Sequence, residues 1–370
     1  MLTSKDRIAF FLPGLYEGGA ERVILNLAEG VAERGFPVDL VLARAEGPYM
    51  SQVPQSVRLI DLKAMRVLTS VPALTRYLCS EQPTALLSAL FANLIALMSR
   101  RLSGLPRRLV ISEHNTLSSV SQQQPDLRWQ LYPKLAGWLY PGADEIIAVS
   151  HGVAEDLART TTVPRHRIQV VYNPVVTADV GEKSKIPLDH PWFKPGEPPV
   201  ILAVGRLTRQ KAFDVLIRAF SQVQKRCPAR LLILGEGEDR SMLESLIKQL
   251  GLETDINLPG FVQNPYPYMT RAALLVLPSR WEGLPTVLIE ALYLGTPIVA
   301  TDCPGGSREI LKNGEYGRLV PIDSDQMLAD AITTSLNCHF LCPPSESWTP
   351  YTLDFVVDRY LKLLVQAKHA

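Results

Sequence analysis

Two glutamates that lie eight residues apart are the residues of this sequence best suited to chemistry. Glu282 and Glu290 are separated by Pro285 and an otherwise mostly apolar stretch. Strand-like apolar runs at 273–277 and 297–300 flank them, so the pattern predicts strand, loop, helix and strand. Proline fits the first turn of a helix, and the free N–H groups of that turn bind anions. We therefore expect the two carboxylates to bind hydroxyl groups on either side of a phosphate.

Two cations follow another predicted strand. Arg206 comes after the apolar run 200–204 and a glycine, and Lys211 lies five residues farther on, before a predicted helix at 212–224. Arginine offers a planar fork to a phosphate, and lysine offers a compact charge. The pair is therefore placed to hold a diphosphate, and the alternative is a pair of exposed surface cations.

The first half of the chain contributes a glycine pair and a histidine. Gly18 and Gly19 precede a predicted helix, and without side chains they let a ligand approach the backbone closely; the alternative is a tight turn. Neither a Gly-x-Gly-x-x-Gly dinucleotide fingerprint nor a P-loop is present there. His114 follows a predicted strand at 108–112 and adjoins Glu113, so it is expected at the carboxyl edge of the first sheet. A lone histidine at such a place is also compatible with simple packing.

The order of the apolar runs predicts two domains of the α/β class. Strand-like runs alternate with helical patterns in both halves, as in doubly wound parallel sheets. The predicted strands are 7–12, 38–43, 85–87, 108–112 and 145–149 in the first half and 200–204 and 230–234 in the second. A proline- and lysine-rich stretch between them predicts a linker. We predict a domain at 1–180, a linker at 181–199, a domain at 200–345 and a C-terminal helix at 346–370, with ligands at the carboxyl ends of the strands.

The composition is that of an ordinary globular protein. Its 370 residues suffice for two cores, with 46% apolar and 20% charged residues. A net charge of +1 gives no bulk attraction to nucleic acid. The chain shows no signal-peptide pattern and no apolar run of membrane-spanning length, so we expect a cytoplasmic protein. Five scattered cysteines predict reduced thiols rather than a zinc site.

Two further segments have alternative interpretations. Asp323-Ser324-Asp325 has the form of an Asp-x-Asp metal motif, but it precedes a helical run, so we interpret it as a helix cap. Residues 58–134 hold ten Lys and Arg against four Asp and Glu, around an apolar helical pattern at 90–102. Such a region suits contact with an anionic membrane or a pyrophosphate lipid; the alternative is a solvated helix end.

Taken in order, these motifs resemble those of the family 4 retaining glycosyltransferases. The resemblance covers nearly the whole chain. Its motifs are the Glu-x7-Glu pair of Glu282 and Glu290, Gly18-Gly19-Ala20-Glu21-Arg22, Ser112-Glu113-His114-Asn115, Asn173-Pro174, Val204-Gly205-Arg206-Leu207 with Lys211, and Gly305-Gly306-Ser307-Arg308-Glu309.

The resemblance implies a GT-B fold, in which two Rossmann-like domains face each other across a cleft and the last helix returns to the first domain. It implies a retaining, metal-independent hexosyltransferase without a cofactor, which moves a sugar from a nucleotide diphosphate sugar. We expect a UDP-sugar as donor and a glycan or lipid-linked acceptor, in bacterial polysaccharide or glycolipid biosynthesis. The protein would then work in the cytoplasm, with peripheral contact to the inner face of the membrane.

The resemblance also implies roles for individual residues. The diphosphate would bind Arg206 and Lys211, the ribose would bind Glu290, and the donor sugar would lie near Glu282 and His114. These four residues, His114, Glu282, Arg206 and Lys211, are the expected catalytic set. The other expected donor-binding residues are Gly18, Gly19, Val262, Gly283, Leu284, Thr286 and Glu290. The family's usual aromatic residue after the first glutamate is absent, because Gly283 stands there. The segment 258–269 is expected to border the base and suits uracil or guanine alike.

Two alternatives remain open from the sequence. One is another enzyme on the same architecture, either a nucleotide-sugar epimerase or a phosphorylase. The other is a non-catalytic subunit that binds a sugar nucleotide. The combined presence of Arg206, Lys211, Glu282 and Glu290 argues against the second.

Overall fold

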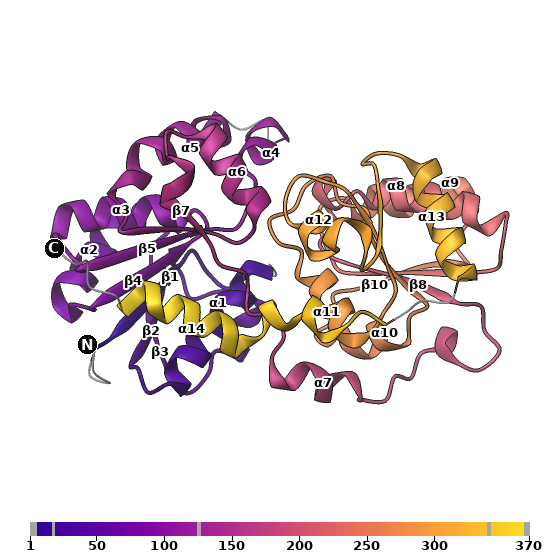
Figure 1. Ribbon diagram of the computed structural model, residues 1–370, viewed down its shortest axis with the longest axis horizontal. Helices are drawn as coiled ribbons and strands as arrows, with labels where there is room; N and C mark the ends of the chain where they lie inside the picture. The colour runs from indigo at the N-terminus through magenta and orange to yellow at the C-terminus, as the bar shows by residue number, and fades with distance from the viewer. Residues whose placement is uncertain (1–5, 17–18, 124–126, 339–341, 366–370) are drawn as a thin grey trace. The chain divides into compact units, whose positions relative to one another are not determined.

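A computed structural model describes residues 6–16, 19–123, 127–338 and 342–365 of the chain (Figure 1). The chain forms two compact units. Unit 1 comprises residues 1–175 and 351–370, and unit 2 comprises residues 176–350. Both are parallel α/β structures, as the alternation of apolar runs predicts.

Unit 1 is built on a seven-stranded parallel sheet with the order β3-β2-β1-β4-β5-β6-β7. Its strands are β1 Ile8–Leu12, β2 Val38–Leu42, β3 Val57–Asp61, β4 Ala85–Ala89, β5 Arg108–Glu113, β6 Glu145–Ala148 and β7 Ile168–Val170. Its helices are α1 Gly19–Glu33, α2 Val71–Glu81, α3 Ala92–Ser103, α4 Leu117–Gln123, α5 Leu127–Leu139, α6 His151–Thr160 and α14 Leu353–Val365. Helices cover both faces of the sheet, with α1 and α14 on one face and α3 on the other (Figure 1).

The C-terminal helix α14 is part of unit 1. It buries Val356, Val357 and Tyr360 in the same core as the apolar face of α1. Gly30 of α1 allows the two helices to approach closely, because a Cβ atom there would lie 2.7 Å from Cγ2 of Val357. The last helix therefore completes the core that the first helix begins.

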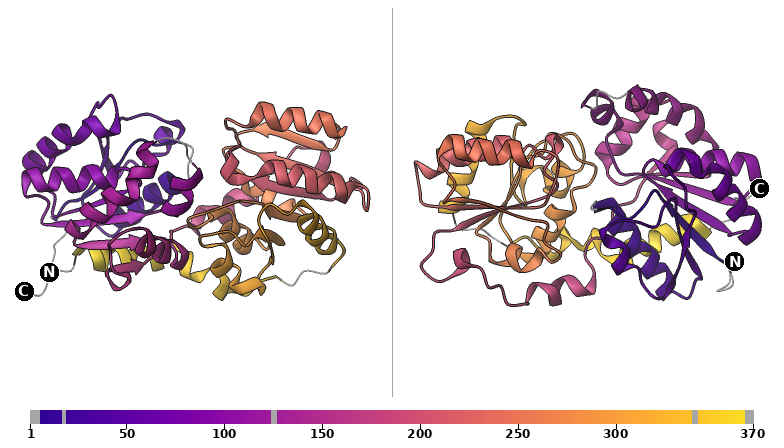
Figure 2. Two further views of the ribbon diagram at one scale, coloured as in Figure 1. Left: turned by 90° about the horizontal axis from the view of Figure 1, so that it is seen from above. Right: turned by 180° about the vertical axis from the view of Figure 1, so that it is seen from behind.

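Unit 2 is built on a six-stranded parallel sheet with the order β10-β9-β8-β11-β12-β13. Its strands are β8 Val200–Val204, β9 Arg230–Leu234, β10 Ile256–Gly260, β11 Leu274–Leu277, β12 Ile298–Thr301 and β13 Arg318–Val320. Its helices are α7 Ala178–Ser184, α8 Phe213–Gln224, α9 Arg240–Leu250, α10 Tyr266–Arg271, α11 Thr286–Leu294, α12 Ser307–Ile310 and α13 Asp325–Asn337. Figure 2 shows its sheet between two layers of helices.

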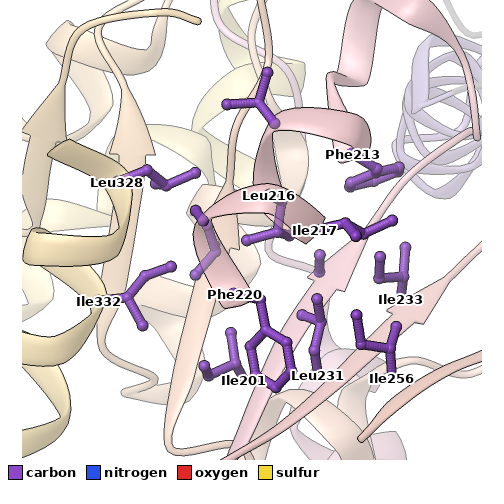
Figure 3. Close-up of a cluster of buried hydrophobic side chains, with 14 of the residues drawn as sticks. Ile201, Phe213, Leu216, Ile217, Phe220, Leu231, Ile233, Ile256, Leu328 and Ile332 are labelled. Atoms are coloured by element: carbon purple, nitrogen blue, oxygen red, sulfur yellow. The ribbon is translucent and has the colours of Figure 1, made fainter. Parts of the chain in front are cut away.

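The core of unit 2 lies between the sheet and helices α8, α9 and α13. Phe213, Leu216 and Phe220 of α8 point onto the strands, where they meet Ile201 and Leu231 (Figure 3). The spacing of these α8 residues places them on one face of the helix. This packing holds the loops at the carboxyl ends of β8, β9 and β11 in place.

The stretch 181–199, predicted as a linker, is not devoid of secondary structure. Helix α7 occupies Ala178–Ser184 and buries Val180, and a short 3-10 helix follows at Pro191–Phe193. The prolines begin only after this helix, so they do not interrupt it, and Pro191 occupies the first turn of the 3-10 helix, where proline is tolerated. Unit 1 ends at Val175, five residues before the predicted boundary.

In the part of the chain that the structure describes, the helices are too short or too polar to cross a membrane.

Candidate functional site

A lysine and a glutamate that are 71 residues apart in the sequence meet at the carboxyl edge of the sheet of unit 2. Nζ of Lys211 donates a hydrogen bond to Oε1 of Glu282 at 2.6 Å. The hydroxyl of Ser279, two residues after β11, donates to the same oxygen at 2.6 Å. Glu282 is only 5% exposed, and a buried carboxylate is costly without such partners. The structure therefore joins two of the predicted site residues in one ion pair.

The loop that carries Lys211 is hydrogen-bonded to the loop after β11. The backbone N–H of Arg280 donates to the carbonyl of Gln210 at 2.8 Å, and Nε2 of Gln210 donates to the carbonyl of Trp281 at 2.9 Å. The Arg280 guanidinium donates in addition to the carbonyl of Arg209 at 2.7 Å. These reciprocal bonds place Lys211 against Glu282 before any ligand binds.

The backbone on both sides of Glu282 is held by the loop after β12. Its N–H donates to the carbonyl of Pro304, and the N–H of Gly306 donates to the carbonyl of Gly283, both at 2.9 Å. Between them, Gly305 has a φ of +125°, and a Cβ atom there would lie 2.1 Å from the Glu282 carbonyl oxygen. Only glycine satisfies both conditions, so this part of the Gly-Gly motif acts on the geometry of Glu282.

Arg206 lies in the loop after β8 and is exposed. The backbone around it is tied to the loop after β9, because the N–H of Leu207 donates to the carbonyl of Glu236 at 2.8 Å. Gly235 has a φ of +144°, and a Cβ atom there would lie 2.0 Å from the Gly205 carbonyl oxygen. The guanidinium is thus presented on an anchored loop, five residues before Lys211.

Glu290 lies inside α11 and is 6% exposed, which excludes the interpretation as a solvent-facing helix residue. The hydroxyl of Tyr266 donates to its Oε1 at 3.4 Å. Thr286 begins the helix, and Gly283 and Leu284 in the preceding loop are buried. Pro285, predicted within the first turn, is instead the N-cap residue, because its ψ of 103° is extended.

Val262 follows β10, the edge strand that lies two strands away from β8. It is partly buried. Its loop therefore borders the same edge of the sheet as the loops of Arg206 and Lys211.

In unit 1, His114 directly follows β5 and is 6% exposed. Its Nε2 lies 3.0 Å from Oγ of Ser112. Burial lowers the pKa of its imidazole to about 4. The side chain is therefore neutral near pH 7, and a neutral imidazole can donate one hydrogen bond and accept another.

Glu113 forms a buried network that the sequence did not reveal. The hydroxyl of Tyr140 donates to its Oε2 at 2.8 Å, and the backbone N–H groups of His114 and Asn115 point to its Oε1 at 3.2 and 3.4 Å. Tyr140 is in turn 2.9 Å from the hydroxyl of Tyr132. Burial raises the pKa of the Glu113 carboxyl to about 7, although these hydrogen bonds act in the opposite direction.

Of the two glycines of the first motif, the structure describes Gly19. Gly19 is the first residue of α1 and is exposed. Gly18 lies outside the described residues.

The interpretation of Asp323-Ser324-Asp325 as a helix cap is confirmed. Ser324 is the N-cap of α13, and its Oγ accepts a hydrogen bond from the N–H of Met327. Asp323 accepts a hydrogen bond from the Arg280 guanidinium at 2.6 Å, so it stabilises the loop described above.

Three residues that shape the site were not predicted. Ser279 and Arg280 lie between the predicted strand at 273–277 and Glu282, and this position was the available signal for them. Tyr266 falls within the segment expected to border the base, but nothing in its spacing indicates a contact with Glu290. Such pairings depend on loops that meet only in the folded sheet.

Comparison with known proteins identifies the family. The model of the Glycosyltransferase Family 4 matches residues 17–179, and that of Glycosyl transferases group 1 matches residues 186–352. The N-acetylgalactosamine-N,N'-diacetylbacillosaminyl-diphospho-undecaprenol 4-alpha-N-acetylgalactosaminyltransferase of Campylobacter jejuni is 32% identical over 342 residues, 90% of each chain. The amylovoran biosynthesis glycosyltransferase AmsD of Erwinia amylovora is 27% identical over 301 residues, 81% of each chain.

Solved structures agree in fold. HepE of Anabaena, solved in complex with UDP-glucose, has a TM-score of 0.74 at 20% identity and covers 97% of this chain and 95% of its own. WaaG, a glycosyltransferase involved in lipopolysaccharide biosynthesis, has a TM-score of 0.74 at 18% identity and covers 97% of this chain and 100% of its own. With the two parallel α/β units and the relatives above, these matches show that the chain belongs to family 4 of the glycosyltransferases and has the GT-B type of fold.

Proposed function

We propose that this glycosyltransferase transfers a sugar from a UDP-sugar to a lipid-linked or glycan acceptor, with retention of configuration and without an essential metal. The observation that carries the proposal is the ion pair of Lys211 with the buried Glu282 on anchored loops, with Arg206 exposed on the same loop as Lys211. Two facts about relatives support the substrates. The name of the Campylobacter jejuni enzyme contains a diphospho-undecaprenol acceptor, and HepE was solved with UDP-glucose.

In this proposal Arg206 and Lys211 neutralise the diphosphate. The ammonium group of Lys211 has three N–H donors, and its bond to Glu282 uses one of them, so it can also donate to a phosphate oxygen. The N–H groups at the start of α11 face the same charge. Cations and helix amides of this kind stabilise a departing diphosphate without a metal ion.

The carboxylates bind hydroxyl groups of the donor. Among the described residues, both hydrogen bonds to the Glu282 side chain end on Oε1. Its Oε2 is therefore assigned to hydroxyls of the donor sugar. Glu290, held by Tyr266, is assigned to the ribose.

The transfer itself needs no protein nucleophile. The bond between the anomeric carbon and the β-phosphate oxygen breaks, and a bond from the acceptor hydroxyl oxygen to that carbon forms on the same face. The hydroxyl proton passes to an oxygen of the departing β-phosphate. UDP and the glycosylated acceptor are the products.

A surface of unit 1 fits the proposed contact with the inner face of a membrane. Met65, Leu68, Leu102 and Trp138 are between 68% and 89% exposed. The exposed Arg101 lies with its guanidinium over the Trp138 ring at 5.7 Å. Apolar side chains next to cations suit insertion among anionic headgroups.

Sedimentation with vesicles tests this contact. Binding to vesicles that contain phosphatidylglycerol should fall with added salt and should weaken in Arg101→Glu and Trp138→Ala. Equal sedimentation of wild type and both variants would refute this surface.

The reaction is tested by the release of UDP or GDP from a panel of nucleotide sugars, in the presence of EDTA. Release from one UDP-sugar by the wild type, and its loss in Lys211→Ala and Glu290→Ala, is the expected result. Lys248→Ala, which removes an exposed lysine from α9, is the matched control and should retain activity. Release that requires added metal, or that survives both site substitutions, would contradict the proposal. With an acceptor, the anomeric configuration of the product is read by NMR.

A further inference from the structure

Two buried hydroxyl groups connect the C-terminal helix to His114. The hydroxyl of Tyr360 on α14 lies 3.4 Å from Oγ of Ser112 on β5, and this Oγ lies 3.0 Å from Nε2 of His114. Tyr360 and Ser112 are both 0% exposed. All three residues belong to unit 1, and 248 residues separate Tyr360 from Ser112 in the sequence.

The other nitrogen of the imidazole is in a different situation. Nδ1 of His114 is buried and has no hydrogen-bond partner among the described residues. The same holds for Oδ1 of Asn93 and Oγ1 of Thr116. Asn93 is oriented by its Nδ2, which donates to the Ser112 carbonyl at 3.0 Å, so its Oδ1 has to point elsewhere. Buried polar atoms without partners are rare, and each of them calls for a partner such as a water molecule or a ligand.

The direction of the hydrogen bonds decides which nitrogen of His114 carries the proton. In one arrangement Tyr360 donates to Ser112, Ser112 donates to Nε2, and the proton of His114 is on Nδ1. In the other, Nε2–H donates to Ser112, and the Ser112 and Tyr360 hydroxyls share one hydrogen bond in either direction, so one of their two protons and the Nδ1 lone pair are left without a partner. The first arrangement leaves only Nδ1–H unsatisfied. It also uses the phenol, a more acidic hydroxyl than serine, as the donor.

We infer that Ser112 and Tyr360 are positioning residues that hold His114 in the tautomer with the proton on Nδ1, so that Nδ1–H is available to donate to an oxygen of the sugar substrate. The assignment of the acceptor to the sugar rests on the proposed function, whereas the tautomer does not. A buried donor without a partner is costly in the free protein, and a ligand oxygen that accepts its hydrogen bond recovers that free energy on binding. The C-terminal helix thereby contributes to the chemistry of the first unit as well as to its core.

Nitrogen NMR of histidine-labelled protein tests the tautomer directly, because protonated and unprotonated imidazole nitrogens have well-separated chemical shifts. The His114 signals among the six histidines are assigned with His114→Asn. Wild type should show a protonated Nδ1 without any ligand. Ser112→Ala should shift the population towards the Nε2–H form, Ser112→Thr should restore the wild-type state, and Tyr360→Phe should have a smaller effect because its bond is longer.

A control separates this role from folding alone. Ser99→Ala removes another fully buried hydroxyl of unit 1, which donates to the Val71 carbonyl at 3.3 Å. It should leave the tautomer unchanged. In turnover assays we expect Ser112→Ala to lower kcat by roughly tenfold, the loss of about one hydrogen bond, while KM for the donor changes little.

Three results would overturn parts of the inference. Protonation of Nε2 in wild type, or an unchanged tautomer in Ser112→Ala, would exclude the positioning role. If the UDP-sugar and UDP change the Nδ1 resonance equally, the sugar is not the acceptor. Absence of turnover with every donor, together with a protonated Nδ1, would refute the proposed function but not the tautomer.

Discussion

Replacement of Glu113 by glutamine should change how the stability of unit 1 depends on pH. Burial raises the pKa of this carboxyl from 4.5 to about 7 in the folded protein. The folded state therefore binds the proton more tightly than the unfolded state. The contribution of this carboxyl to the free energy of unfolding is greatest below pH 4.5 and is lost as the pH rises through 7. At about 1.4 kcal/mol for each pH unit, the total loss is about 3 kcal/mol.

Glutamine is a close mimic of the protonated acid at this position. Its carbonyl oxygen can accept from the N–H groups of His114 and Asn115, as Oε1 of Glu113 does. Its amide N–H can donate to the Tyr140 hydroxyl, whose proton then turns to Tyr132 at 2.9 Å. The variant therefore preserves the network but has no ionised form.

The assay is urea unfolding at several pH values between 5 and 8, with the difference between variant and wild type as the measured quantity. His114 complicates the absolute curves, because its lowered pKa of about 4 makes stability fall as the pH decreases from 6.5. This effect is common to both proteins and cancels in the difference. Relative to wild type, Glu113→Gln should gain about 2.5 kcal/mol between pH 5 and pH 8.

The matched control is Glu155→Gln, which removes a carboxyl with a 69% exposed side chain on α6. It should show no comparable gain. A difference between Glu113→Gln and wild type that stays constant with pH, or that moves in the opposite direction, would refute the reasoning about Glu113.

Two predictions concern unit 2. Gly305→Ala introduces a Cβ atom 2.1 Å from the Glu282 carbonyl oxygen at a φ of +125°, so it should abolish donor turnover. Gly314→Ala is its control, because it has a φ of +100° but no atom within 4 Å of the added Cβ, and it should cost only about 1–2 kcal/mol of stability and retain turnover. Equal activity of the two variants would show that the Gly305 contact does not position Glu282. Lys211→Met leaves the buried Glu282 without its cation and should destabilise unit 2 by about 3–5 kcal/mol. Addition of Glu282→Gln should recover part of that loss in a double-mutant cycle measured by urea unfolding, and strictly additive effects would contradict the pairing.

The regular elements near the site were predictable from short stretches of sequence. The runs 200–204 and 230–234 coincide with β8 and β9, because a strand buried on both faces of a parallel sheet is apolar throughout. Glu290 was predicted as a functional carboxylate from its apolar neighbours, and the structure shows it buried inside α11. The stretch 181–199 was predicted as a linker because it is rich in proline, and this was wrong where α7 extends into it. The prolines all follow this short helix, so they gave no indication of it.

The sequence by itself determined the residue types that could bind a diphosphate sugar, their order and the two α/β domains, because these depend on local periodicity and on motifs within single βα units. The tertiary structure alone decided which of them meet. Lys211 pairs with Glu282 across 71 residues, and Tyr360 approaches Ser112 across 248 residues. Such contacts arise where the carboxyl ends of neighbouring strands bring their loops to one edge, and where a helix from the chain's end packs on the first sheet. No local pattern encodes them, because each depends on the register of strands that are distant in sequence.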